Sequence, residues 1–180
     1  MASSSSSVLS DLRRVVTAHD AGGAAVIQTD AAIPSQTIGD FEGFRVGTIW
    51  ASTPIPCKDN NLPEDGVSRY VGNGLVVPNG SGFRYTDLGP GGITPMHRTS
   101  SVDYNVLVQG ELTLILEDGT ETHLKNPGDV IIQKGTNHAW RNPCKSWTRW
   151  VSVIIDAEPA TVGGEPLADI LPMVRVIWEV

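Results

Sequence analysis

Positive charge is scarce in this sequence. The 180 residues include 13 lysines and arginines against 20 aspartates and glutamates, which gives a formal net charge of −7 at pH 7. Binding to nucleic acid phosphates requires a basic surface, so we do not expect a nucleic acid partner. No apolar run approaches the roughly 20 residues that cross a bilayer, and the serine-rich start lacks the apolar core of a secretory signal. We therefore expect a soluble, cytoplasmic protein that does not bind membranes.

Cysteine is scarce as well. The two cysteines, Cys57 and Cys144, suit a reducing compartment, and their spacing is not typical of a metal site. The hydrophobic fraction of 40% and the charged fraction of 18% are ordinary for a globular protein and argue against wholesale disorder. We expect a disordered-like, serine-rich tail over residues 1–7 and a single domain over residues 8–180.

The two ends of this domain differ from its middle. Near the start, Ser10 can cap a short helix that ends at Gly22-Gly23. The apolar residues with helical spacing there are Val8, Leu9, Leu12, Val15 and Val16. Residues 166–180 are strongly apolar, so we expect a C-terminal extension that docks on the domain or on a second subunit.

Between these ends the pattern indicates short strands separated by turns rich in Gly, Pro, Asn and Asp. The candidate strands are residues 24–28, 44–51, 74–77, 82–88, 102–109, 111–117, 121–124, 129–133, 138–141 and 147–156. Residues 54–66 are expected to form an exposed loop or lid. Many short strands with one helix at an end predict an all-β fold, either a sandwich or a closed barrel.

Two glycine-bounded segments each carry a histidine. The first contains, in order, Gly91, His97, Thr99, Asp103 and Gly110, and the second contains Gly128, Asp129, Gly135, His138 and Asn142. These segments resemble the paired motifs of the cupins, which are small jelly-roll proteins. The resemblance implies a single cupin β-barrel with its motif core over residues 91–142, and it implies that both histidines face the same interior.

The first segment departs from the complete cupin pattern. Cupins with a full ligand set bind a metal through three histidines and a glutamate, whereas here Thr99 replaces one histidine and Asp103 the glutamate. His97, Asp103 and His138 still resemble a two-histidine, one-carboxylate set that could bind a divalent metal such as Fe, Zn or Mn. Thr99 is a poor ligand for these ions, so we favour a site without a cofactor.

Without a metal, the same three residues predict an acid–base site. A histidine paired with a carboxylate in an apolar barrel has the tunable pKa that proton transfer at neutral pH requires. Five residues are candidates to bind a substrate, and they are Arg84, Tyr85, Thr99, Tyr104 and Trp140. Trp140 shares strand parity with His138, so both are expected to face the interior.

Residues 97–104 and 135–142 carry a narrower resemblance, to the small single-domain cupins of fungal secondary-metabolite clusters. That resemblance implies a small-molecule substrate derived from a polyketide or a terpenoid, and a homodimer. Our first hypothesis is a lyase or cyclase, in which His97 or His138 protonates a leaving hydroxyl and Asp103 orients or accepts the proton. Loss of water from such a substrate would give a quinone-methide-type intermediate, which the barrel could steer into a pericyclic cyclisation.

Two alternatives stay open at this point. One is a metal-dependent oxidoreductase or dioxygenase that uses His97, Asp103 and His138 as ligands. The other is a cupin that binds a small molecule without turning it over. The sequence does not identify the substrate in any of the three cases.

Overall fold

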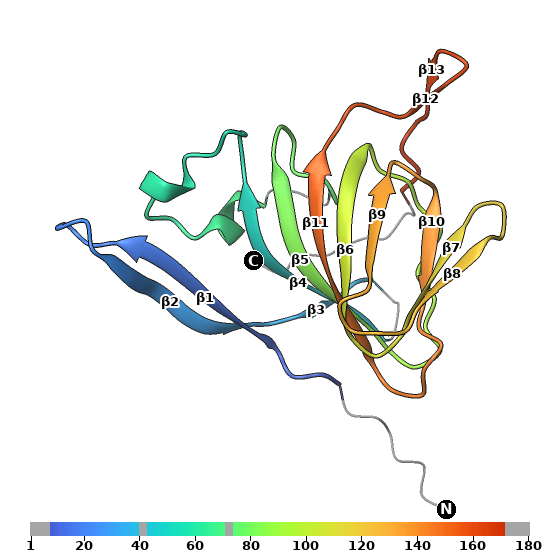
Figure 1. Ribbon diagram of the computed structural model, residues 1–180, viewed down its shortest axis with the longest axis horizontal. Coiled ribbons are helices and arrows are strands. Elements are labelled where there is room, and N and C mark those ends of the chain that lie inside the picture. Colours follow the sequence, from blue (N-terminus) through green and yellow to red (C-terminus); the bar gives the residue numbers. More distant parts are fainter. Residues whose placement is uncertain (1–7, 40–42, 71–73, 172–180) are drawn as a thin grey trace, which may run out of the picture.

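The computed structural model describes residues 8–39, 43–70 and 74–171, and these consist mainly of strands and turns (Figure 1). The strands are β1 (Leu12–His19), β2 (Ala25–Ile33), β3 (Gln36–Thr37), β4 (Phe44–Ser52), β5 (Ser81–Leu88), β6 (Ser101–Gln109), β7 (Leu112–Leu116), β8 (Glu121–Leu124), β9 (Val130–Lys134), β10 (His138–Arg141), β11 (Thr148–Asp156), β12 (Thr161–Val162) and β13 (Glu165–Pro166). Two short 3-10 helices, η1 (Asp59–Asn61) and η2 (Gly66–Arg69), lie between β4 and β5. Within these ranges, no helix has the length and apolar character that crossing a membrane requires.

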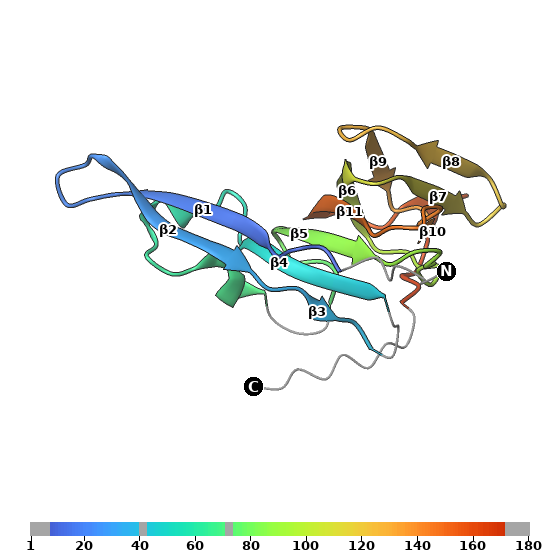
Figure 2. The ribbon, with the colours of Figure 1, turned by 90° about the horizontal axis from the view of Figure 1, so that it is seen from below.

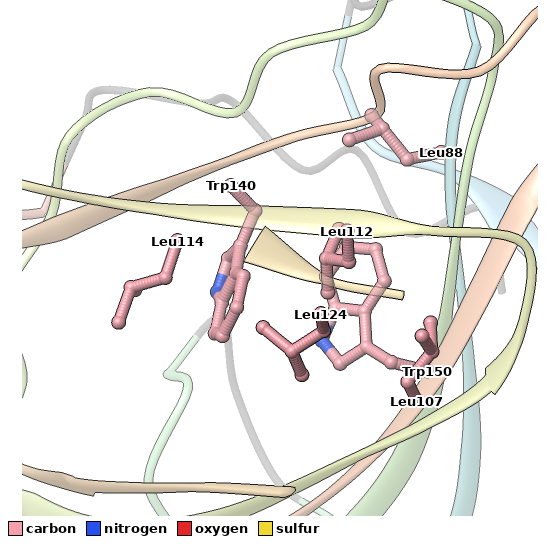
Figure 3. Packing of buried hydrophobic residues seen from close by; sticks show 7 residues of the cluster. All are labelled: Leu88, Leu107, Leu112, Leu114, Leu124, Trp140 and Trp150. Carbon is pink, nitrogen blue, oxygen red and sulfur yellow. The ribbon is translucent and has the colours of Figure 1, made fainter. Parts of the chain in front are cut away.

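Two antiparallel sheets face each other and enclose the main core. One sheet has the strand order β3-β4-β5-β11-β6-β9, and the other has the order β10-β7-β8. Apolar side chains from both sheets meet between them (Figure 3). The buried members of this cluster are Leu88, Leu107, Leu112, Leu114, Leu124, Trp140 and Trp150. We call the side of the larger sheet that faces this core its inner face. This arrangement confirms the predicted all-β jelly roll.

A second layer covers part of the outer face of the larger sheet. The β1–β2 hairpin crosses that face at its base and projects beyond the sheet (Figures 1 and 2). Ile33, Ile49 and Tyr85 form a small buried cluster beneath it. On the same face, the Asp87 carboxylate accepts two hydrogen bonds of 2.6 Å from the Arg149 guanidinium. The sheet is thus buried on both sides over part of its area.

The predicted N-terminal helix is wrong, because this segment forms β1. Exposure alternates strictly along β1, and the less exposed positions include Leu12 and Arg14. Arg14 can occupy such a position because its guanidinium forms an ion pair with Asp65 and also donates to the Ile49 carbonyl at 3.0 Å. The residues expected to end a helix instead form the hairpin turn, where Gly23 has a φ of +85°.

Most of the predicted strands are present in the structure. Nine of the ten candidate strands overlap an observed strand, whereas residues 74–77 form no strand and contain a bend at Leu75 and Val76. The predicted loop at residues 54–66 is largely exposed and contains η1 and the start of η2. The serine tail at residues 1–7 lies outside the described residues, as do residues 172–180 of the C-terminal extension.

Gly110 shows why a motif position requires glycine. This residue follows β6 and has a φ of +79°, in the left-handed region that side chains disfavour. A Cβ built there would lie 2.5 Å from the Thr148 hydroxyl oxygen. The turn from β6 into β7 can therefore pass close to the start of β11 only without a side chain.

The buried ion pair between Asp87 and Arg149 predicts a strong effect on stability. Replacing Asp87 with alanine leaves the guanidinium buried without its partner, which should lower the free energy of unfolding by about 3–5 kcal/mol. Chemical denaturation monitored by circular dichroism measures this change. The control is Asp30→Ala, which breaks the exposed pair with Arg13 and should have a much smaller effect. Equal effects of the two substitutions would contradict the prediction.

Candidate functional site

The two motif segments are joined directly by their backbones. Residues 92–98 run antiparallel to β10, and the amide of His97 donates to the His138 carbonyl at 2.8 Å. The His138 amide donates back to the His97 carbonyl at 2.9 Å, so the two residues form a directly opposed pair. Opposed residues on neighbouring strands place their side chains on the same side. The imidazole centroids accordingly lie 4.2 Å apart.

Both imidazoles are held in the same tautomer. Nδ1 of His97 lies 2.9 Å from the Pro95 carbonyl oxygen, and Nδ1 of His138 lies 2.9 Å from the Thr136 carbonyl oxygen. A carbonyl oxygen only accepts hydrogen bonds, so each Nδ1 carries the hydrogen. In the neutral ring, Nε2 then has a free lone pair. The site therefore presents two adjacent hydrogen-bond acceptors.

Burial sets the charge of these rings. It lowers the pKa of His97, because the protonated ring loses hydration; the nearby charge of Arg84 also lowers this pKa, while Asp103 opposes the shift. Burial and the neighbouring His97 together lower the pKa of His138 to about 3. At neutral pH both rings are therefore uncharged, and they can act as bases or as hydrogen-bond acceptors.

Asp103 lies near His97, and burial shifts its pKa in the opposite direction. Burial raises the pKa of the Asp103 carboxyl, and the Ser101 hydroxyl, Arg84 and His97 only partly oppose the shift. Ser101 donates to Oδ1 of Asp103 at 2.7 Å, and the hydroxyls of Ser101 and Thr99 lie 2.8 Å apart. These contacts orient the carboxyl and leave its Oδ2 available to carry a proton.

A polar row on the inner face continues from this carboxyl. The strand register places Arg84 of β5, Ser152 of β11 and Asn105 of β6 side by side. The Ser152 hydroxyl donates to the Asn105 side-chain oxygen at 2.6 Å, and the Asn105 amide donates to Gln133 at 3.3 Å. Sequence reasoning missed Ser101, Asn105, Gln133 and Ser152. The even spacing of Ser101, Asp103 and Asn105 along one predicted strand could have indicated two of them.

The predicted substrate-binding residues fall into two groups. Arg84, Thr99 and Trp140 lie with the histidines, and the Trp140 ring packs edge-on against His138 at 5.7 Å between centroids. Tyr85 and Tyr104 do not lie with the histidines, so the structure does not support the prediction that they bind the substrate at this site. Tyr85 lies in the outer-face cluster, where its hydroxyl donates to the Ile33 carbonyl at 2.6 Å. Tyr104 is exposed, and the strand register places it on the outer face.

The arrangement does not fit a three-ligand metal centre. In the described part of the chain, no group of three or more His, Cys, Asp or Glu side chains is placed to hold a metal ion. His97 and His138 offer two nitrogen donors, but Thr99 stands at the position of the third histidine and is hydrogen-bonded to Ser101. The Asp103 carboxyl is held in turn by that serine.

A C-terminal strap, residues 157–171, supports the His97 segment from its other edge. Arg98 and Ile170 exchange two backbone hydrogen bonds of 2.9 Å. The Ser100 hydroxyl donates to the Asp169 carboxylate at 2.7 Å. The segment that carries His97 therefore lies between β10 and the strap, so its position depends on residues distant in sequence.

Comparison with known proteins identifies relatives over most of the chain. The chain is 37% identical to phomopsin biosynthesis cluster protein D of Diaporthe leptostromiformis over 162 residues, which cover 87% of this chain and 85% of the relative. It is 31% identical to the cupin-domain-containing oxidoreductase fogC of Aspergillus ruber over 163 residues, or 88% and 79% of the two chains. The Cnp3 cupin domain of Schizosaccharomyces pombe shares the fold, with a TM-score of 0.51 at 10% identity over 80% of this chain and 87% of that one. No family model matches the chain.

The lowered pKa of His138 predicts a measurable pH dependence. By NMR, its ring should remain neutral down to a pH of about 3. In the unfolded chain an imidazole takes up a proton near pH 6.5, so the free energy of unfolding should fall as the pH falls from about 6.5 towards 3. His138→Gln removes this ionisable group and should weaken that dependence. Titration of the folded His138 ring near pH 6.5 would contradict the prediction.

Proposed function

The chain belongs to the cupins of fungal secondary-metabolite clusters, and from that premise we propose that it catalyses acid–base dehydration or cyclisation of a polyketide- or terpenoid-derived small molecule. The proposed catalytic residues are His97, Asp103 and His138. We propose that the reaction takes place beside the inner face of the larger sheet, where these side chains lie together.

One observation supports this chemistry above the others. Two neutral imidazoles with free Nε2 atoms lie close to a carboxyl group whose pKa is raised by burial. Burial favours the unprotonated form of the rings and the protonated form of the carboxyl, and proton transfer in both directions requires a base and an acid in these forms. These pKa shifts favour the reverse of the roles expected from the sequence: a histidine accepts the proton, and Asp103 donates one.

In the proposed dehydration, Nε2 of His97 or His138 removes a proton from a C–H or O–H group of the substrate. The electron pair released forms a new double bond, and the bond to the leaving hydroxyl breaks. Asp103 donates its proton to that hydroxyl, which leaves as water. Return of the histidine's proton to the Asp103 carboxylate restores the starting state.

Cyclisation would follow from positioning rather than from further proton transfer. Trp140 lies beside His138, and its ring centroid is 5.7 Å from that of Trp150. Flat aromatic surfaces of this kind can hold a reactive, quinone-methide-type product in one folded shape. Holding two reacting ends together lowers the entropic part of the barrier to ring closure.

The name of the Aspergillus ruber relative supports a second candidate. That protein is called an oxidoreductase, so a metal-dependent oxidoreductase is our alternative. His97, His138 and Asp103 would have to hold a divalent ion, which would supply redox or Lewis-acid chemistry. Because Asp103 is bonded to Ser101 and Thr99 offers no strong donor, this alternative requires the site to rearrange.

Deletion of the encoding gene tests the reaction class. We expect a compound to accumulate that is heavier than the pathway's next intermediate by one water, or an isomer of it if only cyclisation is lost. The purified protein should convert this compound in the presence of a chelator, and mass spectrometry of substrate and product measures the change. An accumulated compound that differs by two hydrogens or by one oxygen, with activity lost on chelation, would instead support the oxidoreductase.

Substitution of Asp103 tests its role as the acid. Asp103→Asn should lower kcat by about 10²- to 10⁴-fold, because the amide has no acidic proton to give. Since burial raises the pKa of Asp103 above its unfolded value, ionisation of this group costs stability as the pH rises. The variant should therefore be at least as stable as the wild type at neutral pH, as thermal unfolding would show.

A matched substitution controls for the loss of one carboxylate. Asp118 lies in the exposed turn between β7 and β8, so Asp118→Asn should leave kcat unchanged. An Asp103→Asn variant that is folded and turns over at the wild-type rate would contradict the assignment of Asp103 as the acid.

A further inference from the structure

Arg84 differs from the other arginines in the described part of the chain. Each of the others bonds to a described residue, and they are Arg13, Arg14, Arg45, Arg69, Arg98, Arg141 and Arg149. No hydrogen bond or ion pair joins Arg84 to another described residue, although its side chain is half-buried. A guanidinium is always charged and carries five N–H donors, so leaving it unpaired in a partly buried place is costly.

The neighbours of Arg84 cannot easily satisfy these donors. On the inner face it lies in one row with Ser152 and Asn105. These two side chains are hydrogen-bonded to each other, and Asn105 is also bonded to Gln133. Asp103 is the nearby carboxyl, yet its Oδ1 accepts from Ser101, and it does not approach Arg84 within ion-pair distance. The other members of the row thus bond to one another, and the Arg84 guanidinium has no hydrogen-bond partner among the residues that the structure describes.

Arg84 also lies beside a group of buried aromatic side chains. The row next to it on the inner face contains Trp150, which packs against Trp140, and Trp140 in turn contacts His138. A molecule held at the guanidinium would lie against the part of the core that these two buried rings form. The surroundings therefore combine a cation that has no partner among the described residues with a group of packed aromatic side chains.

We propose that Arg84 binds a carboxylate of the substrate and so selects molecules that combine an acidic end with an aromatic or other apolar body. The two oxygens of a carboxylate match the planar fork of a guanidinium, which gives both strength and orientation. The anchored acid places the rest of the molecule against Trp140 and His138. This inference rests on the proposed function for its site, and it adds the chemical class of the substrate.

A pair of probe molecules tests the inference without knowledge of the natural substrate. 3-Phenylpropionate has an apolar ring and a carboxylate, and 3-phenylpropanamide has the same shape without the charge. Both are titrated into the protein at millimolar concentration, and the indole N–H signals of Trp140 and Trp150 report binding by NMR. We expect the acid to bind the wild type about tenfold or more tightly than the amide.

Three variants assign that preference to Arg84. Arg84→Gln should abolish the preference for the acid, whereas Arg84→Lys should retain part of it because the positive charge remains. Arg13→Gln on the exposed hairpin removes the same charge elsewhere and should change nothing. The spread of the indole signals shows that each variant is folded.

The outcomes separate this inference from the reaction itself. Equal affinity of the wild type for acid and amide, including no binding of either, would overturn it. A preference for the acid that survives in Arg84→Gln would overturn it too. If the acid preference is found but no dehydration or cyclisation is detected, the carboxylate site stands and the proposed reaction falls. If the reaction is found on a neutral substrate, the reverse holds.

Discussion

The position of β11 between β5 and β6 decides which side of the sheet each functional side chain occupies. The register places Arg84, Ser152 and Asn105 in one inner row, while Asp87 and Arg149 pair on the outer face. Because side chains alternate along a strand, a shift of β5 by one residue would exchange its two faces. It would place Arg84 on the outer face and separate Asp87 from Arg149. The ion pair therefore helps to hold the register on which the inner row depends.

Within that register, burial alone accounts for most of the chemistry at the site. Loss of hydration disfavours the charged form of any group, so it favours an imidazole that is free to accept a proton and a carboxyl that still holds one. The same effect shifts the pKa values of His97, His138 and Asp103 in the directions that favour their neutral forms. The guanidinium of Arg84 keeps its positive charge, because an arginine does not lose its proton in proteins. One fixed charge thus remains among groups that can change theirs.

The motif segments could be predicted from the sequence because they resemble the paired motifs of the cupins, and that resemblance implied that both histidines face one interior. The turn at Gly110 excludes a side chain for a local reason, whereas the opposed pair of His97 and His138 joins segments that are distant in sequence. The N-terminal strand could not be predicted in this way. Arg14 occupies a less exposed position there only because Asp65 binds it, and that contact lies 51 residues away in the chain. Local periodicity therefore favoured a helix.

The faces of β5 and β6 were hard to predict for a different reason. Parity shows that Arg84 and Tyr85 point to opposite sides, but it does not show which side is the site. The hairpin buries the outer face over Tyr85 as the second sheet buries the inner one, so apolar character marks both sides. Tyr85 and Tyr104 could be assigned to the outer face only with the position of the β1–β2 hairpin known. The sequence pattern predicted a helix in place of its first strand.

The C-terminal strap has a consequence for synthesis on the ribosome. The His97 segment is held on one edge by β10 and on the other by Ile170, and β11 must enter between β5 and β6 after both have been made. A chain that leaves the exit tunnel from its N-terminus can form the β1–β2 hairpin early, but it cannot complete the site until some seventy further residues have followed His97. Through that interval β5 and β6 lack the strand that joins them. Nascent chains are therefore exposed to association through these open edges, which makes the last part of translation the stage at which a chaperone would matter most.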